Sequence, residues 1–359
     1  MPSIEDGGVE KNFFIISNYL SNKFKNTSII TSVNRFNHKL NNANIINPSF
    51  KFKEIHGRRL RYFFCLLELI KLIFEYKKDV IILTFQANLY SAIICKILGI
   101  KIIIRSNSSP SGWSNNIFKK FLYKIFLQLP NKIIVNSNDF KKELKNKFKV
   151  DSLCIFNPLN INEIKKKSKE IINLNFFKTS KSIIKIIFVG RFVEQKDPMT
   201  FLKALLLINK KMNFKALIIG RGILKNKMYN FIKENNLEKK IKLLNFQDNP
   251  YKYIAKCNLL VLSSKYEGLP NVLLEAITLN KFVISSNCPT GPREILDNGK
   301  GGTLFKIGNF KQLSEKIILF NNDKKKHNDK LKFARKRLIR FNYKENLQKY
   351  FKLIESEIN

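Results

Sequence analysis

The sequence has few of the residues from which metal centres and disulfide frameworks are built. Its five cysteines are scattered without a C-x-x-C pair, and its three histidines, His38, His56 and His327, lie far apart in the chain. Such cysteine usage is typical of a reduced, cytosolic protein. A D-x-D motif, which would hold a divalent metal between diphosphate oxygens, does not occur either. We therefore expect no metal site and no cofactor.

Acidic residues are also scarce. There are 27 Asp and Glu against 66 Lys and Arg, a formal net charge of +39. An excess of this size favours phosphate-bearing partners, such as nucleic acid or an anionic membrane surface. The chain is rich in Lys, Asn and Ile together, a bias that codon composition alone can produce, so we expect part of the excess to be solvated. A nucleic-acid-binding protein is the less favoured alternative, because no such motif occurs and the basic residues are spread along the whole chain.

Long apolar runs are absent as well. The most apolar segment, residues 62–76, contains Glu68, Lys71 and Glu75 and is shorter than the about 20 residues that a spanning helix needs. Residues 112–129 place apolar side chains on one face and lysines on the other (Phe118, Phe121, Leu122, Ile125, Phe126 and Leu129 against Lys119, Lys120 and Lys124). This pattern is typical of a helix in a membrane interface, and also of a helix that covers a sheet. We expect a cytoplasmic protein, peripheral on the inner face of the membrane.

Short apolar runs alternate with helix-like segments along most of the chain. Strands are predicted at 28–33, 80–84, 101–105, 132–136, 183–189, 216–219, 241–244, 258–262 and 282–285. Helices are predicted at 12–20, 60–76, 88–98, 116–129, 162–175, 198–208, 225–235, 250–255, 310–321 and 344–358. Strands that alternate with helices predict an α/β fold with parallel sheets, and the length allows two doubly wound, Rossmann-like domains facing a cleft.

We predict an N-terminal domain at 1–157, a linker at 158–182, a C-terminal domain at 183–340 and a terminal helix at 341–359. The N-terminal domain lacks a first strand in this prediction. Only four residues precede the loop around Gly7 and Gly8, and a mean strand runs about five to six residues. We therefore expect that the native chain begins upstream of Met1.

The segment 263–275, S-S-K-Y-E-G-L-P-N-V-L-L-E, follows a buried strand and opens a helix at Pro270. Asn271 and Glu275 lie one turn apart on this helix, and Glu267 precedes its N-terminus, where backbone amides favour an anion. Two acids beside a phosphate-binding helix end predict a ligand with hydroxyls and phosphates, such as a nucleotide sugar. Alternatively, Glu275 forms a surface salt bridge and Glu267 is a solvated loop acid.

Two further strand ends carry glycines and cations. Gly-Arg-Phe follows the strand 183–189 and is followed by Lys196, and Gly-Arg-Gly at 220–222 follows the strand 216–219. Glycines let backbone amides approach a phosphate, and Arg191 and Lys196 would neutralise it in the absence of a metal motif. In so basic a chain, both cations could instead be solvated surface residues.

These motifs resemble the retaining glycosyltransferases of family 4, which have the GT-B fold. The matching pieces are G-R-F with Lys196, G-R-G, and E-G-L-P-N-V-L-L-E with its two glutamates at the family's spacing. The segment C-P-T-G-P-R-E-I-L at 288–296 is similar to one common in members that build bacterial surface glycans. Gly-Gly-Val-Glu at 7–10 resembles the family's first loop. The resemblance covers most of the chain and is strongest from 183 to 305.

The resemblance implies a retaining hexosyltransferase. Such an enzyme would move a sugar from a nucleoside-diphosphate donor, UDP-linked, to a glycan or polyprenyl-linked acceptor in lipopolysaccharide or capsule biosynthesis. It implies catalytic roles for Glu267, Arg191 and Lys196, with both cations on the donor diphosphate, and places Glu275 against the ribose hydroxyls. The implied donor-binding residues are Gly8, Arg191, Lys196, Gly222, Glu267, Gly268, Leu269, Asn271 and Glu275.

Two points stay open on the N-terminal side. Many relatives carry a histidine in the loop after the strand 80–84, where this chain has Phe-Gln-Ala-Asn. Arg105 and Asn107, which follow another strand, are candidates to line the acceptor side. A GT-B sugar-nucleotide epimerase is the alternative activity, and it would turn over donor without an acceptor.

Overall fold

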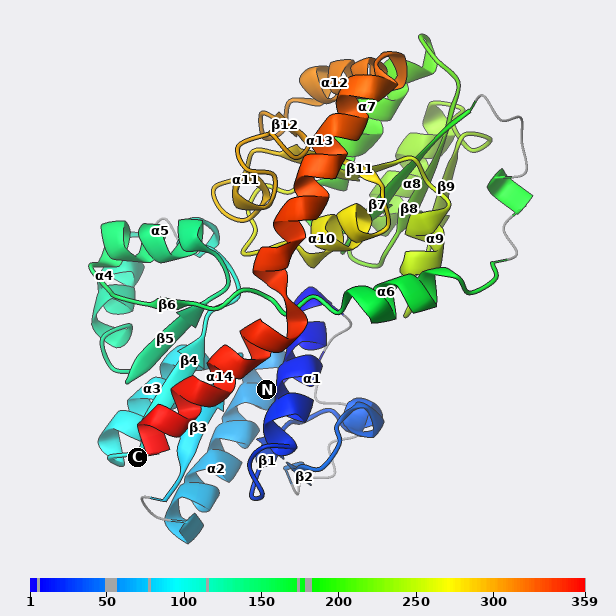
Figure 1. Ribbon diagram of the computed structural model, residues 1–359. Helices are drawn as coiled ribbons and strands as arrows, with labels where there is room; N and C mark the ends of the chain where they lie inside the picture. Colours follow the sequence, from blue (N-terminus) through cyan, green and yellow to red (C-terminus); the bar gives the residue numbers. More distant parts are fainter. Residues whose placement is uncertain are drawn as a thin grey trace. The chain divides into compact units, whose positions relative to one another are not determined.

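The computed structural model describes residues 1–4, 7–48, 57–76, 79–113, 116–172, 175–177 and 183–358. The chain divides into two compact units: unit 1 is Met1–Pro158 with Tyr343–Asn359, and unit 2 is Leu159–Asn342. Each unit combines helices with parallel strands (Figure 1), which confirms the predicted α/β class. The predicted terminal helix thus belongs to unit 1, and the helix that we placed in the linker belongs to unit 2.

Unit 2 contains one six-stranded parallel sheet in the order β12-β11-β10-β7-β8-β9. Its strands are β7 (Ile184–Val189), β8 (Phe214–Ile219), β9 (Ile241–Leu244), β10 (Leu259–Leu262), β11 (Phe282–Ser286) and β12 (Thr303–Phe305). The strand order reverses between β7 and β10. In doubly wound sheets, ligands bind outside the carboxyl ends of the strands at this reversal.

Helices surround the sheet of unit 2. They are α6 (Ile161–Ser168), η3 (Asn175–Phe177), α7 (Pro198–Asn209), α8 (Lys225–Glu234), α9 (Tyr251–Ala255), α10 (Asn271–Thr278), α11 (Pro292–Ile295), α12 (Phe310–Asn322), α13 (Lys324–Arg337) and η4 (Leu338–Phe341). All four residues of β10 are buried, and so are Ile186, Ile187 and Phe188 of β7. Strands covered on both faces need apolar residues at successive positions, which is why these segments are continuous apolar runs.

Unit 1 contains a four-stranded parallel sheet in the order β3-β4-β5-β6 and a separate parallel pair, β1 and β2. These strands are β1 (Ser28–Ile30), β2 (Asn44–Ile46), β3 (Ile81–Thr84), β4 (Lys101–Arg105), β5 (Lys132–Val135) and β6 (Leu153–Cys154). The described residues 1–4 form no strand. The Met1 amino group donates to the Ile30 carbonyl at 2.8 Å, and the Ser32 amide donates to the Pro2 carbonyl at 3.2 Å.

The helices of unit 1 pack against two cores. They are α1 (Gly8–Ser21), η1 (Asn34–Lys39), α2 (Arg58–Tyr76), α3 (Asn88–Ile97), η2 (Pro110–Gly112), α4 (Ile117–Phe126), α5 (Asn138–Phe148) and α14 (Tyr343–Ile358). Helices α1 and α14 contact each other and share one core, which includes Ile16 and Tyr350 (Figure 1). Buried residues of α2, α3 and α5, such as Leu69, Ala92 and Phe140, belong to the other core.

Most predicted elements are confirmed within a few residues, although the helix predicted at 162–175 ends at Ser168 and the elements α5, α11, β2, β6 and β12 were not predicted. Two further differences are informative. Pro270 precedes α10 as its N-cap residue, so the helix starts at Asn271 rather than at Pro270. Helix α13 was not predicted, because its sequence KKKHNDKLKFARKR carries charged residues around almost its whole circumference and shows no apolar stripe. Among the described residues, no helix has the length and apolar content needed to cross a bilayer.

Candidate functional site

The chemistry-bearing loops of unit 2 meet at the reversal point of its sheet. Strand β7 leads into residues 190–197, and its neighbour β10 leads into residues 263–270. The Lys265 amide donates to the Gln195 carbonyl at 2.8 Å, and the Gln195 side-chain amide donates to the Tyr266 carbonyl at 3.1 Å. The Ser263 hydroxyl donates to the Asp197 carbonyl at 2.8 Å. These bonds fix one loop on the other.

Lys196 and Glu267 form an ion pair at this junction. Lys196 Nζ lies 2.5 Å from Glu267 Oε1, and the Ser264 hydroxyl donates to the same oxygen at 2.6 Å. The two side chains are only 17% and 7% exposed. Glu267 is therefore a buried, paired carboxylate, and the alternative interpretation as a solvated loop acid is wrong. Because the pair lies at the strand ends where doubly wound sheets bind ligands, it is a candidate to bind a charged ligand.

The segment 288–296 supports the loop that carries Glu267. The Thr290 hydroxyl donates to the Glu267 carbonyl at 2.5 Å. Gly291 has φ +85, and a Cβ built on it would lie 2.4 Å from the Gly268 carbonyl oxygen. A larger residue would push this loop out of place. Sequence reasoning assigned no role to Thr290 or Gly291, although the resemblance of C-P-T-G-P-R-E-I-L to surface-glycan enzymes pointed to the segment.

Cys288 lies beside this pair, and its thiol is held in the neutral form. It is buried, and burial, with a further contribution from the Glu267 carboxylate, raises the pKa of its thiol to about 12. The thiolate is the nucleophilic form of cysteine, so Cys288 stays a neutral thiol at physiological pH.

Arg191 lies exposed, in contrast to Lys196. Its Nη2 donates to the Gln195 side chain at 3.1 Å, and Gln195 in turn bonds to the loop of Glu267. The guanidinium is thereby linked to the same loops and is exposed to solvent. It is placed to meet an anion that arrives from solvent.

The glycines after β8 serve the packing of the loops. A Cβ on Gly220 would lie 1.9 Å from the Gly190 carbonyl oxygen, and one on Gly222, which has φ +152, would lie 2.4 Å from the Phe192 carbonyl oxygen. We predicted these glycines from their ability to approach a phosphate. Their geometry shows a second reason, because only residues without a Cβ let the β7 and β8 loops lie so close.

Helix α10 carries the second glutamate. Glu275 is buried, and the Tyr251 hydroxyl of α9 donates to its Oε1 at 3.3 Å. A surface salt bridge of Glu275, the alternative interpretation, is therefore wrong. At the start of the helix, Pro270 has no side-chain group that could cap the first amides, and Leu269 before it is buried while Asn271 is half-buried. Backbone amides at such a helix start attract anions.

The candidates of unit 1 are placed differently. Gly8 is the first residue of α1 and is exposed, and its predicted contact with the donor stays a prediction. Arg105 is fully buried. Its guanidinium donates to the Tyr350 hydroxyl at 2.7 Å, to Asn157 Oδ1 at 2.6 Å and to Asn107 Oδ1. Arg105 thus ties α14 to the sheet of unit 1, and this placement gives no support to a role for Arg105 and Asn107 on the acceptor side.

We expect that replacing Arg105 by Met lowers the free energy of unfolding by about 3 kcal/mol, because several buried polar groups lose their partner at once. Burial raises the pKa of Tyr350, so its hydroxyl stays protonated and needs a hydrogen-bond partner. Lys96→Met, at an exposed position of α3, is the control and should change stability by about 0.5 kcal/mol or less. Denaturant unfolding followed by circular dichroism measures both. Equal stabilities of the two variants would contradict the structural role.

No group of three or more His, Cys, Asp or Glu that could hold a metal ion occurs among the described residues. Neither Lys196 nor Glu267 lines either of two cavities in unit 2. One is lined by Asn287, Leu304, Phe305, Lys306, Ile307 and Gln312. The other lies around Phe282 and His327, at the amino ends of β10 and β11. The ion pair and the helix start, rather than these cavities, define the candidate site.

Comparison with known proteins identifies relatives. Over 250 residues the chain is 33% identical to an uncharacterized glycosyltransferase of Methanocaldococcus jannaschii, covering 64% of this chain and 60% of that protein. It is 30% identical over 230 residues to an N-acetylgalactosaminyltransferase of Campylobacter jejuni that acts on a diphospho-undecaprenol glycan, covering 61% and 60%. The matched parts thus span three-fifths of the length of these two relatives. A second such enzyme of that bacterium is 24% identical, with 98% and 96% covered.

Solved structures share the fold. HepE of Anabaena, in complex with UDP and glucose, has a TM-score of 0.80 at 16% identity, with 99% of this chain and 98% of that chain covered. Sucrose-phosphate synthase of Thermosynechococcus elongatus has a TM-score of 0.78 at 16% identity, with 98% and 93% covered. These likenesses confirm the predicted GT-B fold.

Two family models together span nearly the whole chain. Residues 6–162 match the model described as Glycosyltransferase Family 4. Residues 155–337, about half of the chain and the part that holds Lys196, Glu267 and Glu275, match the model described as Glycosyl transferases group 1. The resemblance to family 4 that the sequence motifs carried is confirmed. The chain belongs to the group 1 glycosyl transferases.

Proposed function

We propose that the protein is a retaining glycosyltransferase that moves a hexose from a nucleoside-diphosphate sugar, UDP-linked, to a glycan or polyprenyl-linked acceptor. The observation that carries the proposal is the buried pair of Lys196 and Glu267 at the reversal point of the unit 2 sheet. In a group 1 glycosyl transferase, a cation and a carboxylate held together at this place are suited to bind the two ends of the scissile bond.

Transfer breaks the bond between the sugar C1 and the β-phosphate oxygen, so negative charge builds on the departing diphosphate. Lys196 Nζ, which is paired with Glu267, would also donate a hydrogen bond to a phosphate oxygen. The exposed Arg191 guanidinium would bind the same diphosphate. Fixed cations aimed at charge that develops in the transition state give the largest single contribution in many enzymes. Glu267 would then face the sugar, held in position by Ser264 and Thr290.

The rest of the donor would lie along α10. The amides at the helix start, around Gly268, Leu269 and Asn271, would face the phosphate and the sugar hydroxyls. Glu275 would accept hydrogen bonds from the ribose hydroxyls, with Tyr251 holding its other side. Retention of configuration follows if the acceptor attacks from the face that the diphosphate leaves, with a phosphate oxygen taking the acceptor's proton.

We propose the donor base and the acceptor class from what the relatives bind and act on. HepE was solved with UDP and glucose, which supports a UDP-linked donor. The two Campylobacter jejuni relatives act on glycans linked to undecaprenol diphosphate, and others act in capsular polysaccharide biosynthesis. An acceptor with a polyprenyl anchor lies in a membrane. We therefore place the enzyme peripherally on the cytoplasmic face, with no nucleic-acid partner.

The test is a thermal-shift screen of nucleoside diphosphates and their sugars, followed by transfer assays with radiolabelled donor. A ligand that binds the native state raises the melting temperature. We expect UDP and one UDP-sugar to raise it, and label to move to an extracted polyprenyl-linked glycan. Conversion of the donor to its epimer without an acceptor would instead establish the epimerase alternative. Stabilisation by oligonucleotides and by no nucleotide sugar would overturn the proposal.

We expect that the activity needs no added divalent metal. The motivation is the absent D-x-D motif together with Arg191 and Lys196 at one strand end, which would neutralise the diphosphate in place of a metal. The measurement compares initial transfer rates in EDTA with rates in added magnesium or manganese, and the rates should agree within about twofold. Complete loss in EDTA, restored by either metal, would sink the prediction.

A further inference from the structure

Three neighbouring helices cover one face of the unit 1 sheet. Helix α3 contacts α2 on one side and α4 on the other. The side chains that point toward the sheet, such as Leu69, Ala92 and Cys95, are buried in the core between these helices and the four-stranded sheet. Leu127, just after α4, belongs to the same core. Their other sides therefore face away from the sheet (Figure 1). In a helix that only covers a sheet, we expect those outward positions to be polar.

The outward side of α2 is apolar instead. Leu60, Phe63, Leu67 and Phe74 follow one another at helical spacing, so they form one stripe along the helix. All four are exposed, Phe74 to 68%. Lys71 occupies the remaining position of the stripe. This helix thus has two apolar faces, one packed in the core and one exposed to solvent.

The outward sides of α3 and α4 continue the same feature. Tyr90 and Ile97 lie two turns apart on α3, and Ile97 is 78% exposed. On α4, Phe118, Phe121 and Ile125 form another stripe, with Phe118 67% exposed. We refer to nine of the exposed apolar side chains on the three helices, those on the outward sides described above, as the apolar patch (Leu60, Phe63, Leu67, Phe74, Tyr90, Ile97, Phe118, Phe121 and Ile125).

The apolar patch differs from the rest of the described surface. Helix α5 packs against the same core through Phe140 and Leu144, yet its outward positions Lys141, Lys142 and Lys145 are lysines. In unit 2, exposed large apolar side chains occur singly on different elements (Ile171, Leu207, Ile223, Tyr229, Ile307, Leu319 and Ile339). Single exposed apolar residues are ordinary, whereas a large contiguous group marks a surface that another body covers.

Charge identifies what covers it. On these three helices the basic residues outnumber the acidic ones (Arg58, Arg59, Arg61, Lys71, Lys96, Lys119, Lys120 and Lys124 against Glu68 and Glu75). Glu68 is paired with Lys71 at 3.0 Å. Exposed lysines Lys119, Lys120 and Lys124 stand directly beside the phenylalanines of α4. Long cationic side chains among aromatic ones suit a lipid interface, where the chains enter the acyl boundary and the cations reach the headgroups.

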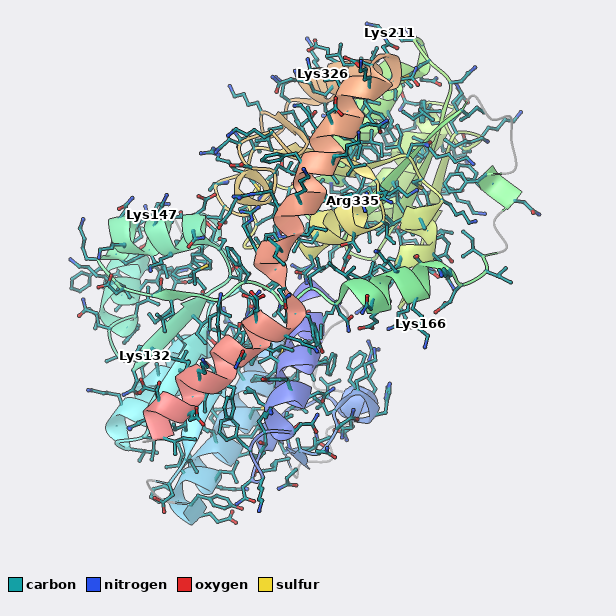
Figure 2. The ribbon with its side chains drawn as sticks, in the orientation of Figure 1. Lys132, Lys147, Lys166, Lys211, Lys326 and Arg335 are labelled. Carbon is teal, nitrogen blue, oxygen red and sulfur yellow. The ribbon has the colours of Figure 1, made fainter. Side chains whose placement is uncertain are left out.

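A protein partner fits less well, because the centres of protein interfaces are depleted of lysine. Basic side chains elsewhere do not select a single face. The residues labelled in Figure 2, such as Lys132, Lys166 and Arg335, project from several elements of both units. Helices α2, α3 and α4 each carry two or more exposed large apolar side chains together with exposed cations, and no other described helix carries more than one such apolar side chain.

We infer that the apolar patch docks unit 1 on an anionic membrane, with α2, α3 and α4 lying in the interface and their phenylalanines entering the acyl boundary. The inference rests on the proposed function for the purpose of membrane docking, since a polyprenyl-linked acceptor lies in such a membrane. Its physical basis is independent of the donor site. The three helices act together, so no single one of them needs the strength of a membrane anchor.

The test measures co-sedimentation with vesicles of phosphatidylcholine alone and of phosphatidylcholine with phosphatidylglycerol in equal parts. The wild type should bind the anionic vesicles and lose binding at raised salt. Phe63→Ser, Phe118→Ser and Phe121→Ser combined should weaken binding by about tenfold or more. Lys119→Glu, Lys120→Glu and Lys124→Glu combined should do the same on anionic vesicles.

The matched control replaces three exposed apolar residues of unit 2, Ile171, Leu319 and Ile339, by Ser, and should bind as the wild type does. Stabilisation by UDP reports the donor site separately and should be unchanged in every variant. If a variant fails to fold, hydrogen exchange of the vesicle-bound wild type decides: α2, α3 and α4 should gain protection, and α13 should not.

Several results would overturn the inference. One is a wild type that ignores anionic vesicles while UDP still stabilises it, which leaves the proposed function standing. Another is equal vesicle binding by the triple Phe variant and the control. A wild type that sediments as a dimer, with the triple Phe variant monomeric and no vesicle binding by either, would assign the patch to a second copy of this chain.

Discussion

Replacing Lys196 by Ala should lower kcat/KM for transfer by about a hundredfold or more, because the transition state loses its most buried cation. Lys196 reaches Glu267 at 2.5 Å in a place where its side chain is only 17% exposed, so little water can substitute for it. A contact that strengthens as charge moves to the leaving group affects kcat as well as KM. We therefore expect kcat to fall even when the donor is saturating. Initial rates over a range of donor concentrations measure both constants.

Lys265 supplies the matched control. It lies on the same pair of loops and forms an ion pair with Glu194 at 2.9 Å, but the two side chains are 44% and 64% exposed. Lys265→Ala should keep activity within about twofold, since exposed ion pairs contribute little. Thermal melting of both variants checks that the loss of Lys196 does not unfold the loop around Glu267. Near-normal turnover of a folded Lys196→Ala at saturating donor would remove Lys196 from the catalytic residues.

Replacing Glu275 by Ala should lower transfer by at least about a hundredfold, chiefly through a weaker hold on the donor. A site built to hydrogen-bond hydroxyls discriminates strongly, because its polar groups are left unpaired when the partner is missing. Glu275 is buried on α10, so in the Ala variant the ribose hydroxyls of a bound donor would be left without their hydrogen-bond acceptor. We expect KM for the donor, and the stabilisation by UDP, to change more than kcat. Isothermal titration with UDP measures the binding part directly.

Tyr251→Phe separates the ligand role of Glu275 from a structural one. It removes the 3.3 Å hydrogen bond to Glu275 Oε1 and leaves the carboxylate in place. If Glu275 serves the donor, this variant should lose less than about tenfold, the scale of one neutral hydrogen bond. The prediction fails if Glu275→Ala binds UDP as the wild type does, or if both variants lose donor binding only because they melt early.

Both glutamates show how far the sequence reaches. The spacing of Glu267 and Glu275 around an apolar helix pointed to a ligand site, yet it equally allowed two solvated acids. Only the fold decided, because the partners of these side chains come from elsewhere in the chain: Lys196 is 71 residues from Glu267, and Tyr251 lies on a different helix from Glu275. Contacts of this kind depend on the strand order β10-β7, which no local pattern encodes.

Arg105 and α13 show where prediction from the sequence failed. Arg105 is the last residue of β4, at the strand end where binding residues often lie, but its partner Tyr350 is 245 residues away on α14 and belongs to the core that α1 and α14 share. Helix α13 lacks an apolar stripe, and it packs through a few positions such as His327 and Ala334, which are buried. Periodicity detects a helix by its contrast between faces, and this helix has almost none.

By itself, the sequence determined the α/β class, most strands and helices and the family, and it supplied the candidate residues of the donor side. These follow from local rules, since apolar runs of strand length, glycine turns and short motifs are written in neighbouring residues. The tertiary structure alone decided which side of an apolar segment meets the core. For residues 112–129 the sequence allowed a sheet-covering helix or an interfacial one. The fold left Phe118, Phe121 and Ile125 outside, beside the equally apolar outer sides of α2 and α3, because burial depends on what packs above a helix as well as on the helix itself.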